Sequence, residues 1–254
     1  MELSPNSSYG KDPEAGNTIQ VNGNTFYYET YGNGEDLLLI HGNGSSIAGL
    51  SFQIEYFRNF YRVIAIDTRG HGKSENNTSE LTYELMADDL LDILNQLKIT
   101  KVRIFGWSDG GIIALCMAMK ASQQIHKLAV MGANTRPIAE SGFEDDIPNL
   151  MKAIANAEEK IRESKNTEFW NRKLAQLLLL KNQPQIEWHE LSSITCKTYI
   201  LAGEFDTVKT HHTKQIQTSI PNATIKIFEG ESHYMPITNP DVLNVELEAF
   251  FKDS

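Results

Sequence analysis

The segment from Gly106 to Gly111, Gly-Trp-Ser-Asp-Gly-Gly, constrains the fold more than any other part of the sequence. It follows an apolar run at residues 102–105 and places Ser108 two positions from a glycine on each side. A serine on a tight turn between a strand and a helix needs small residues at these positions, because a Cβ atom there would collide with neighbouring backbone. The segment therefore predicts a buried strand that ends at a projecting serine hydroxyl and is followed by a helix.

Apolar runs of strand length alternate with helix-like segments along most of the chain. The expected strands lie at residues 19–21, 26–31, 37–40, 62–66, 102–105, 127–131, 198–202 and 224–228. The expected helices lie at residues 48–59, 83–97, 112–119 and 209–219, with a last helix capped by Asn239. This alternation predicts an α/β fold, with a mostly parallel, twisted sheet of about eight strands flanked by helices.

The alternation stops between residues 137 and 185, which contain two helix-like segments and no strand-like run. Thr167 is the expected N-cap of the second segment. We expect residues 137–185 to form a short helical cap, inserted into a core made of residues 17–136 and 186–254. Residues 1–16 are polar and are expected to form a flexible N-terminal segment.

Composition limits the partners and the location of the protein. The formal charge is −10, from 33 acidic and 23 basic residues, which argues against nucleic acid as a partner. No apolar run approaches the roughly 18 residues that span a bilayer, so a soluble protein without a membrane span is predicted. It would be cytoplasmic, or secreted or periplasmic if a signal peptide was removed before Met1. Oligomeric state is left open.

The cysteines and the histidine pair give no metal-binding pattern. Cys116 and Cys196 lie far apart in segments that resemble core elements, which favours buried free thiols. His211 and His212 lack further ligands at suitable spacing, so neither a metal nor a cofactor is expected.

Two residues downstream of Ser108 complete a candidate catalytic set. A serine hydroxyl needs a positioned base, and the base needs an orienting acid. His233 follows the last expected strand and Asp206 follows the strand before it, so both emerge at the same edge of the sheet as Ser108. Glu204 is the competing acid, whereas Asn134, at the end of the preceding strand, cannot carry a negative charge.

These motifs together resemble those of serine hydrolases with the α/β-hydrolase fold. The resemblance is carried by His41-Gly42, by the loop Asp67-x-Arg69-Gly70-x-Gly72-x-Ser74, by the segment at Ser108, by Gly203-Glu204-Phe205-Asp206 and by His233. Gly106–Gly111 is most similar to the nucleophile elbow of the valacyclovir hydrolase and biphenyl hydrolase-like group. The chain order Ser, Asp, His is also the order of this family.

The resemblance implies a mechanism and the residues that perform it. Ser108 would attack an acyl carbonyl, His233 would act as the base, and Asp206 would orient the imidazole. The backbone N–H groups of Asn43 and Asp109 would form the oxyanion hole. Because a main-chain donor survives a change of side chain, Asn43→Ala is expected to be mild.

The expected reaction is hydrolysis of small carboxylic esters through an acyl-serine intermediate, with thioesters, amides and amino-acid esters as variants. Carbon–carbon bond hydrolysis, perhydrolysis on the same residues and non-catalytic binding are the alternatives. Asp109 is either a carboxylate that favours the start of a helix or a pocket-facing group that selects substrates with a free amine. Trp107 and Trp170 are candidate substrate-binding residues, and for Trp170 plain packing is the alternative.

Overall fold

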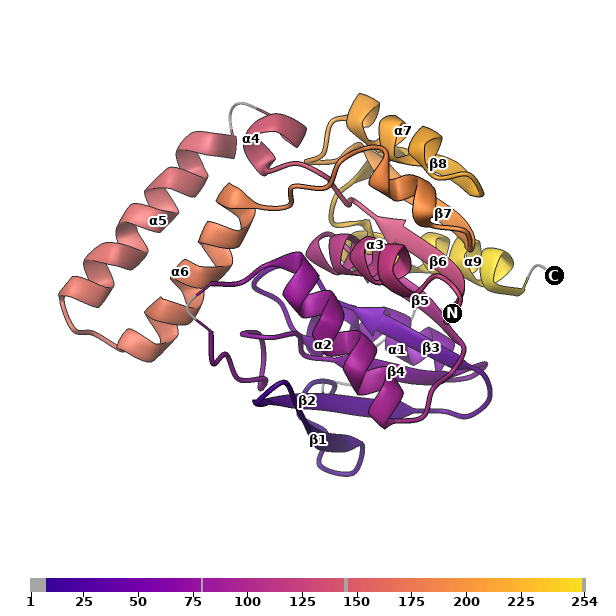
Figure 1. The fold of residues 1–254 in the computed structure, drawn as a ribbon, viewed down its shortest axis with the longest axis horizontal. Helices are drawn as coiled ribbons and strands as arrows, with labels where there is room; N and C mark the ends of the chain where they lie inside the picture. Colours follow the sequence, from indigo (N-terminus) through magenta and orange to yellow (C-terminus); the bar gives the residue numbers. More distant parts are fainter. Residues whose placement is uncertain (1–7, 79, 144–145, 253–254) are drawn as a thin grey trace.

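The computed structural model describes residues 8–78, 80–143 and 146–252 (Figure 1). Its strands are β1 (Gly16–Val21), β2 (Asn24–Tyr31), β3 (Asp36–Ile40), β4 (Arg62–Ile66), β5 (Val102–Trp107), β6 (Ile125–Met131), β7 (Lys197–Phe205) and β8 (Ala223–Ser232). Its α-helices are α1 (Ser51–Phe57), α2 (Tyr83–Gln96), α3 (Asp109–Ala121), α4 (Ile138–Ser141), α5 (Asp146–Arg162), α6 (Thr167–Asn182), α7 (Thr210–Ser219), α8 (Met235–Thr238) and α9 (Pro240–Lys252). No helix in these described parts is both long and apolar enough to cross a membrane.

The eight strands form one sheet in the order β1-β2-β4-β3-β5-β6-β7-β8. The β1–β2 and β2–β4 pairs are antiparallel, and every other pair is parallel. Strands β3, β4 and β5 are buried along almost their whole length, as continuous apolar runs covered on both faces require. The predicted fold class and its mostly parallel sheet are confirmed.

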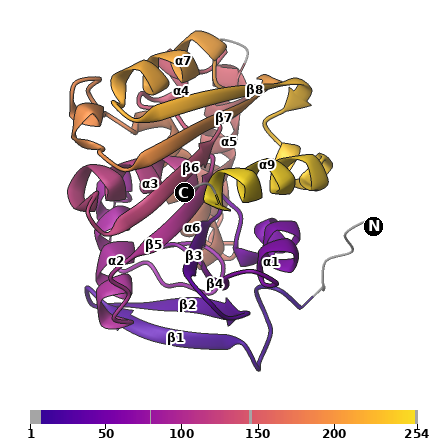
Figure 2. The ribbon, with the colours of Figure 1, turned by 90° about the vertical axis from the view of Figure 1, so that its right-hand side faces the viewer.

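Helices cover both faces of the sheet and create two apolar cores. One core packs α2, α3 and α7 against one face, and the other packs α1 and α9 against the opposite face (Figure 2). The twist of the sheet and its two layers of helices leave the carboxyl ends of the parallel strands at one edge. The loops that carry chemistry in α/β folds gather at this edge.

Several element boundaries differ from the expected ones. The helix expected at residues 48–59 is a 3-10 turn, Ile47–Leu50, followed by α1. Helix α6 begins at Thr167, and its N-cap is Asn166, whose side chain accepts a hydrogen bond from the N–H of Phe169. The prediction that Thr167 is the cap was wrong by one residue, since the side chain of either residue type can accept this bond.

The polar N-terminal segment packs on the core from residue 8 onward. Tyr9 is buried against Tyr31, and its hydroxyl donates a hydrogen bond to Glu55. The N–H groups of Gly10 and Asp12 both donate to the buried carboxylate of Glu29. The predicted flexibility of residues 1–16 is therefore wrong over residues 8–16, and residues 1–7 lie outside the described residues.

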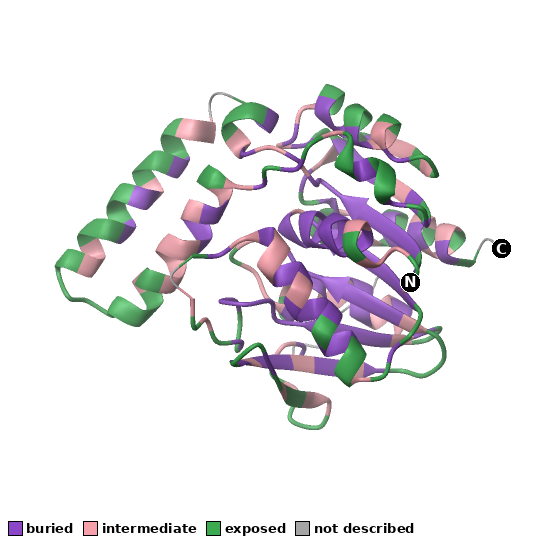
Figure 3. Cartoon of the chain, in the orientation of Figure 1, coloured by how far each residue is buried: buried purple, intermediate pink, exposed green. Residues whose placement is uncertain are grey.

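Helices α4, α5 and α6 lie between β6 and β7, within the segment predicted as a cap. α5 and α6 form a hairpin that projects from the core, with α6 on the side that faces it (Figure 1). α5 buries Leu150, Ile154 and Ala157, and its remaining surface is largely exposed (Figure 3). The hairpin therefore has a small core of its own, and α6 provides its contacts with the rest of the molecule.

Candidate active site

Ser108 lies on a strained turn between β5 and α3. Its backbone has φ 56° and ψ −121°, a conformation that residues with a side chain rarely adopt. A Cβ atom on Gly106 would overlap the backbone of Gly110, and one on Gly110 would overlap the backbone carbonyl of Ile40. The two glycines thus permit the close packing of strand and helix that holds the serine hydroxyl above the sheet edge.

The three residues predicted to act together lie in hydrogen-bond contact. His233 Nε2 is 3.0 Å from Ser108 Oγ, and His233 Nδ1 is 2.7 Å from Asp206 Oδ1. With Nδ1–H donating to the carboxylate, Nε2 is free to accept the serine proton. The competing acid Glu204 is exposed and its carboxylate accepts the N–H of Gly230, so it does not pair with His233.

Residues at the ends of two core strands hold His233 in place, one beside its ring and one at its backbone. Gly132, directly after β6, has φ +65°, and a Cβ atom on it would lie 2.6 Å from His233 Cε1. The indole N–H of Trp107 donates to the backbone carbonyl of His233 at 2.9 Å. Sequence reasoning missed Gly132, and its only signal was a glycine directly after a predicted strand.

Trp107 holds the His233 loop and does not line the cavity at Ser108. Its ring is 5 % exposed and packs in the core on the α1 and α9 side of the sheet. Its prediction as a substrate-binding residue is therefore corrected. Side chains alternate along a strand, so the residue before Ser108 points to the opposite side from the serine.

The loop after β3 also comes close to Ser108. A Cβ atom on Gly42 would lie 3.1 Å from Ser108 Cβ, so the backbone of this loop comes close to the nucleophile. Within the described ranges, the backbone N–H groups of Asn43 and Asp109 donate to no protein acceptor. Two unpaired main-chain donors beside a nucleophile are the composition of an oxyanion hole.

His41 shapes this loop. Its Nε2 accepts the N–H of Thr68 at 3.1 Å, and its Nδ1 lies 2.8 Å from the carbonyl oxygen of Gly42. Complete burial lowers the pKa of His41 to about 4, which keeps the ring neutral and suited to accepting one hydrogen bond and donating another. The residue therefore links the loops after β3 and β4.

The side chain of Asn43 is bound on two sides. Its amide nitrogen donates to Asp109 Oδ2 at 2.8 Å and to the backbone carbonyl of Gln176 on α6 at 3.1 Å. Gln176 is itself buried and donates through Nε2 to the carbonyl of Gly70 at 2.9 Å. The expectation that Asn43→Ala is mild considered the main-chain donor only, whereas the side chain of Asn43 makes these two hydrogen bonds as well.

Asp109 is both the first residue of α3 and part of the cavity wall. It is 3 % exposed, and this burial raises the pKa of its carboxyl group to about 6, although the hydrogen bond from Asn43 opposes the shift. Asp109 thus begins α3 and also lines the cavity at Ser108. Its selection of substrates with a free amine stays a prediction.

The cavity at Ser108 is small, at about 50 Å³. The other residues that line it, apart from Ser108, Asp109 and His233, come from the loops after β6 and β7, from α4 and the residue after it, and from the end of α6 and the residue after it: Gly132, Asn134, Ile138, Ser141, Gly142, Leu180, Gln183, Thr207 and Val208. Trp170 is not among them, because it packs on the hydrophobic cluster between α5 and α6. Its prediction as a substrate-binding residue is corrected to a packing role within the cap.

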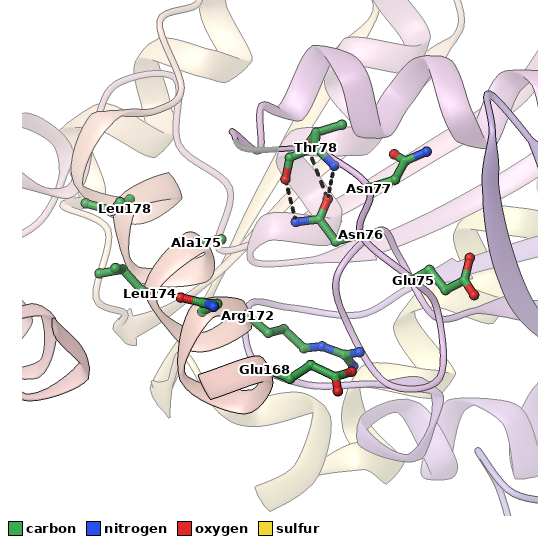
Figure 4. Close-up of a pocket in the computed structure, with 10 residues that line it drawn as sticks. Glu75, Asn76, Asn77, Thr78, Glu168, Arg172, Leu174, Ala175 and Leu178 are labelled. Carbon is green, nitrogen blue, oxygen red and sulfur yellow. Dashed lines mark hydrogen bonds between the residues drawn. The ribbon is translucent and has the colours of Figure 1, made fainter. Parts of the chain in front are cut away.

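A larger cavity of about 660 Å³ lies on another side of α6 (Figure 4). Glu168, Arg172 and Leu174 line it from the helix, opposite Asn76 and Thr78 of the loop after β4. It shares no lining residue with the cavity at Ser108. The larger cavity is therefore not the one that lies beside the strained serine.

Known proteins match both the sequence and the fold. The family model described as alpha/beta hydrolase fold matches residues 37–176, which is more than half of the chain. The chain belongs to the α/β-hydrolase family. The matched segment includes β3 to β6, the nucleophile elbow and most of α6, and the resemblance stated from the motifs is confirmed.

Two relatives and one solved structure show how far this likeness extends. A putative esterase/lipase of Haemophilus influenzae is 24 % identical over 84 % of this α/β hydrolase and 82 % of its own length. The human serine hydrolase BPHL is 27 % identical over 92 % of this chain and 85 % of its own length. The crystal structure of a meta-cleavage product hydrolase, CumD, has a TM-score of 0.76 at 21 % identity and covers 96 % of this chain and all of the other. The protein is therefore a hydrolase of this family.

Proposed function

We propose that this α/β hydrolase cleaves small carboxylic esters with Ser108 as the nucleophile. The proposal is carried by one arrangement, in which Ser108 Oγ lies 3.0 Å from His233 Nε2 and the opposite ring nitrogen lies 2.7 Å from Asp206. A serine hydroxyl is a weak nucleophile, so Ser108 needs His233 as its base, and His233 needs Asp206 to orient its ring. Thioesters, amides and amino-acid esters are variants of the same reaction.

The proposed reaction has two stages. Ser108 Oγ attacks the acyl carbon while His233 Nε2 takes its proton, and the N–H groups of Asn43 and Asp109 donate to the resulting oxyanion. The intermediate then collapses, the C–O bond to the leaving alcohol breaks, and His233 gives its proton to that oxygen. Water releases the acyl group by the same steps with His233 again as the base, while Asp206 stabilises the imidazolium in both stages.

The size of the cavity supports substrates with a short acyl group. About 50 Å³ at Ser108 leaves room for only a few non-hydrogen atoms, whereas drug-sized ligands need roughly 300 Å³ or more. Acetyl and propionyl esters are therefore the preferred class. Carbon–carbon bond hydrolysis is the second candidate, because the same three residues could perform it, but a cavity of this size gives less support to a bulky substrate.

Asp109 supports a preference for acyl groups with a free amine. Its carboxylate lines the cavity next to Ser108, and among the described residues the only other titratable side chain that does so is the imidazole of His233. Comparing glycine and acetate esters, in the wild type and in Asp109→Asn, tests this preference. An equal ratio in the two proteins would remove amine selection from the proposal.

Covalent labelling tests the proposal directly. A fluorophosphonate should add to the wild type at Ser108, and Ser108→Ala should form no adduct and lose at least about 10⁴-fold in kcat on p-nitrophenyl acetate. Among p-nitrophenyl esters, kcat/KM should fall from acetate to butyrate to octanoate. An adduct that persists in Ser108→Ala, or no adduct on the wild type, would favour the non-catalytic binding alternative.

A further inference from the structure

One side chain on the oxyanion side joins three segments that are distant in the sequence. Asn43 follows β3, Asp109 begins α3, and Gln176 lies near the end of cap helix α6. The amide nitrogen of Asn43 donates to the Asp109 carboxylate at 2.8 Å and to the Gln176 carbonyl at 3.1 Å. Each of the two amide hydrogens of Asn43 therefore has an acceptor, and the two hydrogen bonds together fix the orientation of the side chain.

The burial of the partners makes this orientation costly to lose. Asp109 is 3 % exposed, so breaking its bond to Asn43 would leave a buried carboxylate without that donor. Gln176 is 6 % exposed, and its carbonyl would lose a donor in the same step. The side chain of Asn43 therefore has a single favourable position as long as the cap stays in place.

The cap is held by bonds to the neighbouring loop. Gln176 Nε2 donates to the carbonyl of Gly70 at 2.9 Å, and Arg172 Nη1 donates to the carbonyl of Gly72 at 2.9 Å. Gln176 thus contacts the loop after β4 through its side chain and Asn43 through its backbone. A shift of α6 would move the carbonyl that Asn43 contacts.

We propose that Asn43 is a positioning residue, whose side chain holds the backbone N–H of the same residue in the oxyanion hole. The position of α6 on the core controls where this N–H lies. The proposal rests on the proposed function, because an oxyanion hole matters only if Ser108 attacks an acyl carbon. The backbone N–H and the anchored side chain belong to the same residue. If the hydrogen bonds of the Asn43 side chain shift, the Asn43 backbone N–H, which would donate to the oxyanion in the transition state, shifts with them.

The expected effect is intermediate in size. Removing an oxyanion donor typically costs about 10²–10³-fold in kcat, and a misplaced donor retains part of its bond. Asn43→Ala should therefore lower kcat on p-nitrophenyl acetate about 10- to 100-fold, with KM changed by less than about threefold, because the bond forms only in the transition state. A kcat within about twofold of the wild type would overturn the proposal.

The cap side gives a second variant that leaves Asn43 in place. Gln176→Leu removes the bond to Gly70 and keeps the backbone carbonyl, so kcat should fall about 3- to 10-fold through a looser cap. In the double variant with Asn43→Ala the losses should not multiply, because both act on the same donor. If the kcat losses of the two single variants multiply in the double variant, α6 does not act through Asn43 and its control of the donor is overturned. An unchanged kcat in Gln176→Leu would overturn it as well.

Controls separate this proposal from failure of the function or of folding. Asn171→Ala, at an exposed position that faces the larger cavity on α6, should match the wild type. Circular dichroism melting shows whether each variant folds, and if Asn43→Ala does not, Gln176→Leu alone decides the test. If the wild type itself lacks esterase activity and a phosphonate adduct, the proposed function fails and the positioning role fails with it. An active wild type matched by Asn43→Ala contradicts the positioning role only.

Discussion

The two sides of Ser108 Oγ are supported in different ways. On the base side, Asp206, Gly132 and Trp107 all belong to core strands or to the residues directly after them. On the oxyanion side, the loop that carries Asn43 is bound to cap helix α6. The residues proposed to transfer the proton are thus held by strands and by the residues directly after them, whereas the site expected to stabilise negative charge also contacts the inserted helices.

This difference separates the parts of the protein that determine mechanism and selectivity. Leu180 and Gln183, from the end of α6 and the residue after it, line the cavity that would hold the acyl group. The same helix contacts Asn43 through Gln176. A change in the cap that alters which acyl groups fit would therefore also alter the rate of the chemical step. The predictions below perturb the base side, then the oxyanion side, then the cap itself.

Gly132→Ala should cause a large loss of activity although it removes no functional group, because it displaces the base. The added Cβ would lie 2.6 Å from His233 Cε1, so the imidazole must move away from its place beside Ser108. We expect kcat on p-nitrophenyl acetate to fall by about 100-fold or more. Gly230→Ala is the matched control, because Gly230 also has a positive φ, of +74°, but a Cβ there meets nothing within 4 Å. Equal losses in the two variants would show that backbone strain, and not displacement of His233, causes the effect.

Asp109→Asn should change how stability depends on pH. Burial raises the pKa of the Asp109 carboxyl from 3.8 to about 6, so the folded state binds more protons than the unfolded state between these values. The stability that this carboxyl contributes is fully present below about pH 4 and is lost as pH rises through 6. Relative to the wild type, Asp109→Asn should therefore gain about 2 kcal/mol in the free energy of unfolding between pH 4 and pH 8. Denaturant unfolding across this range measures the gain.

A difference between the two proteins that stays constant with pH would contradict the Asp109 prediction. Asp67, whose pKa burial also raises to about 6, titrates in the same range in both proteins and cancels in the comparison. The test thereby isolates the energetic cost of keeping a carboxylate beside the oxyanion loop.

Trp170→Ala should have the smallest effect on activity, because its ring packs inside the cap and away from the cavity. We expect a lower melting temperature, and kcat and KM for p-nitrophenyl acetate within about twofold of the wild type, since the contacts of Gln176 remain. Thermal melting and steady-state kinetics measure the two quantities. A rise in KM with unchanged kcat would restore the substrate-binding role that the sequence suggested.

The sequence predicted the fold and the base side because both follow from local patterns. Ser108, Asp206 and His233 each come directly after a strand whose apolar run is visible in the sequence, and the carboxyl ends of parallel strands necessarily meet at one edge. Glycines around the serine indicated a tight turn for the same local reason. The family of the chain followed from the order of these motifs.

The oxyanion side could not be derived in this way. Asn43 and Gln176 are separated by 133 positions, and their contact depends on where an inserted helix lies on the core. No periodicity specifies that position. The one signal in the sequence is Gln176 itself, a polar residue directly before the apolar run Leu177 to Leu180. For Trp107, the alternation of side chains along a strand is itself a sequence-level argument against substrate binding, because neighbours of a strand-end serine point to the opposite face.

The bonds that join α6 to the loops beneath it share one property. Their acceptors are main-chain carbonyl oxygens, of Gly70, Gly72 and Gln176, and only the donors Gln176, Arg172 and Asn43 use side chains. Gly70 and Gly72 have positive φ angles, and a Cβ atom on Gly72 would lie 2.1 Å from Asp67 Oδ2. The accepting carbonyls are therefore aimed by the shape of the loop after β4, and a remodelled cap helix would keep these bonds only with donors at the positions of Arg172 and Gln176.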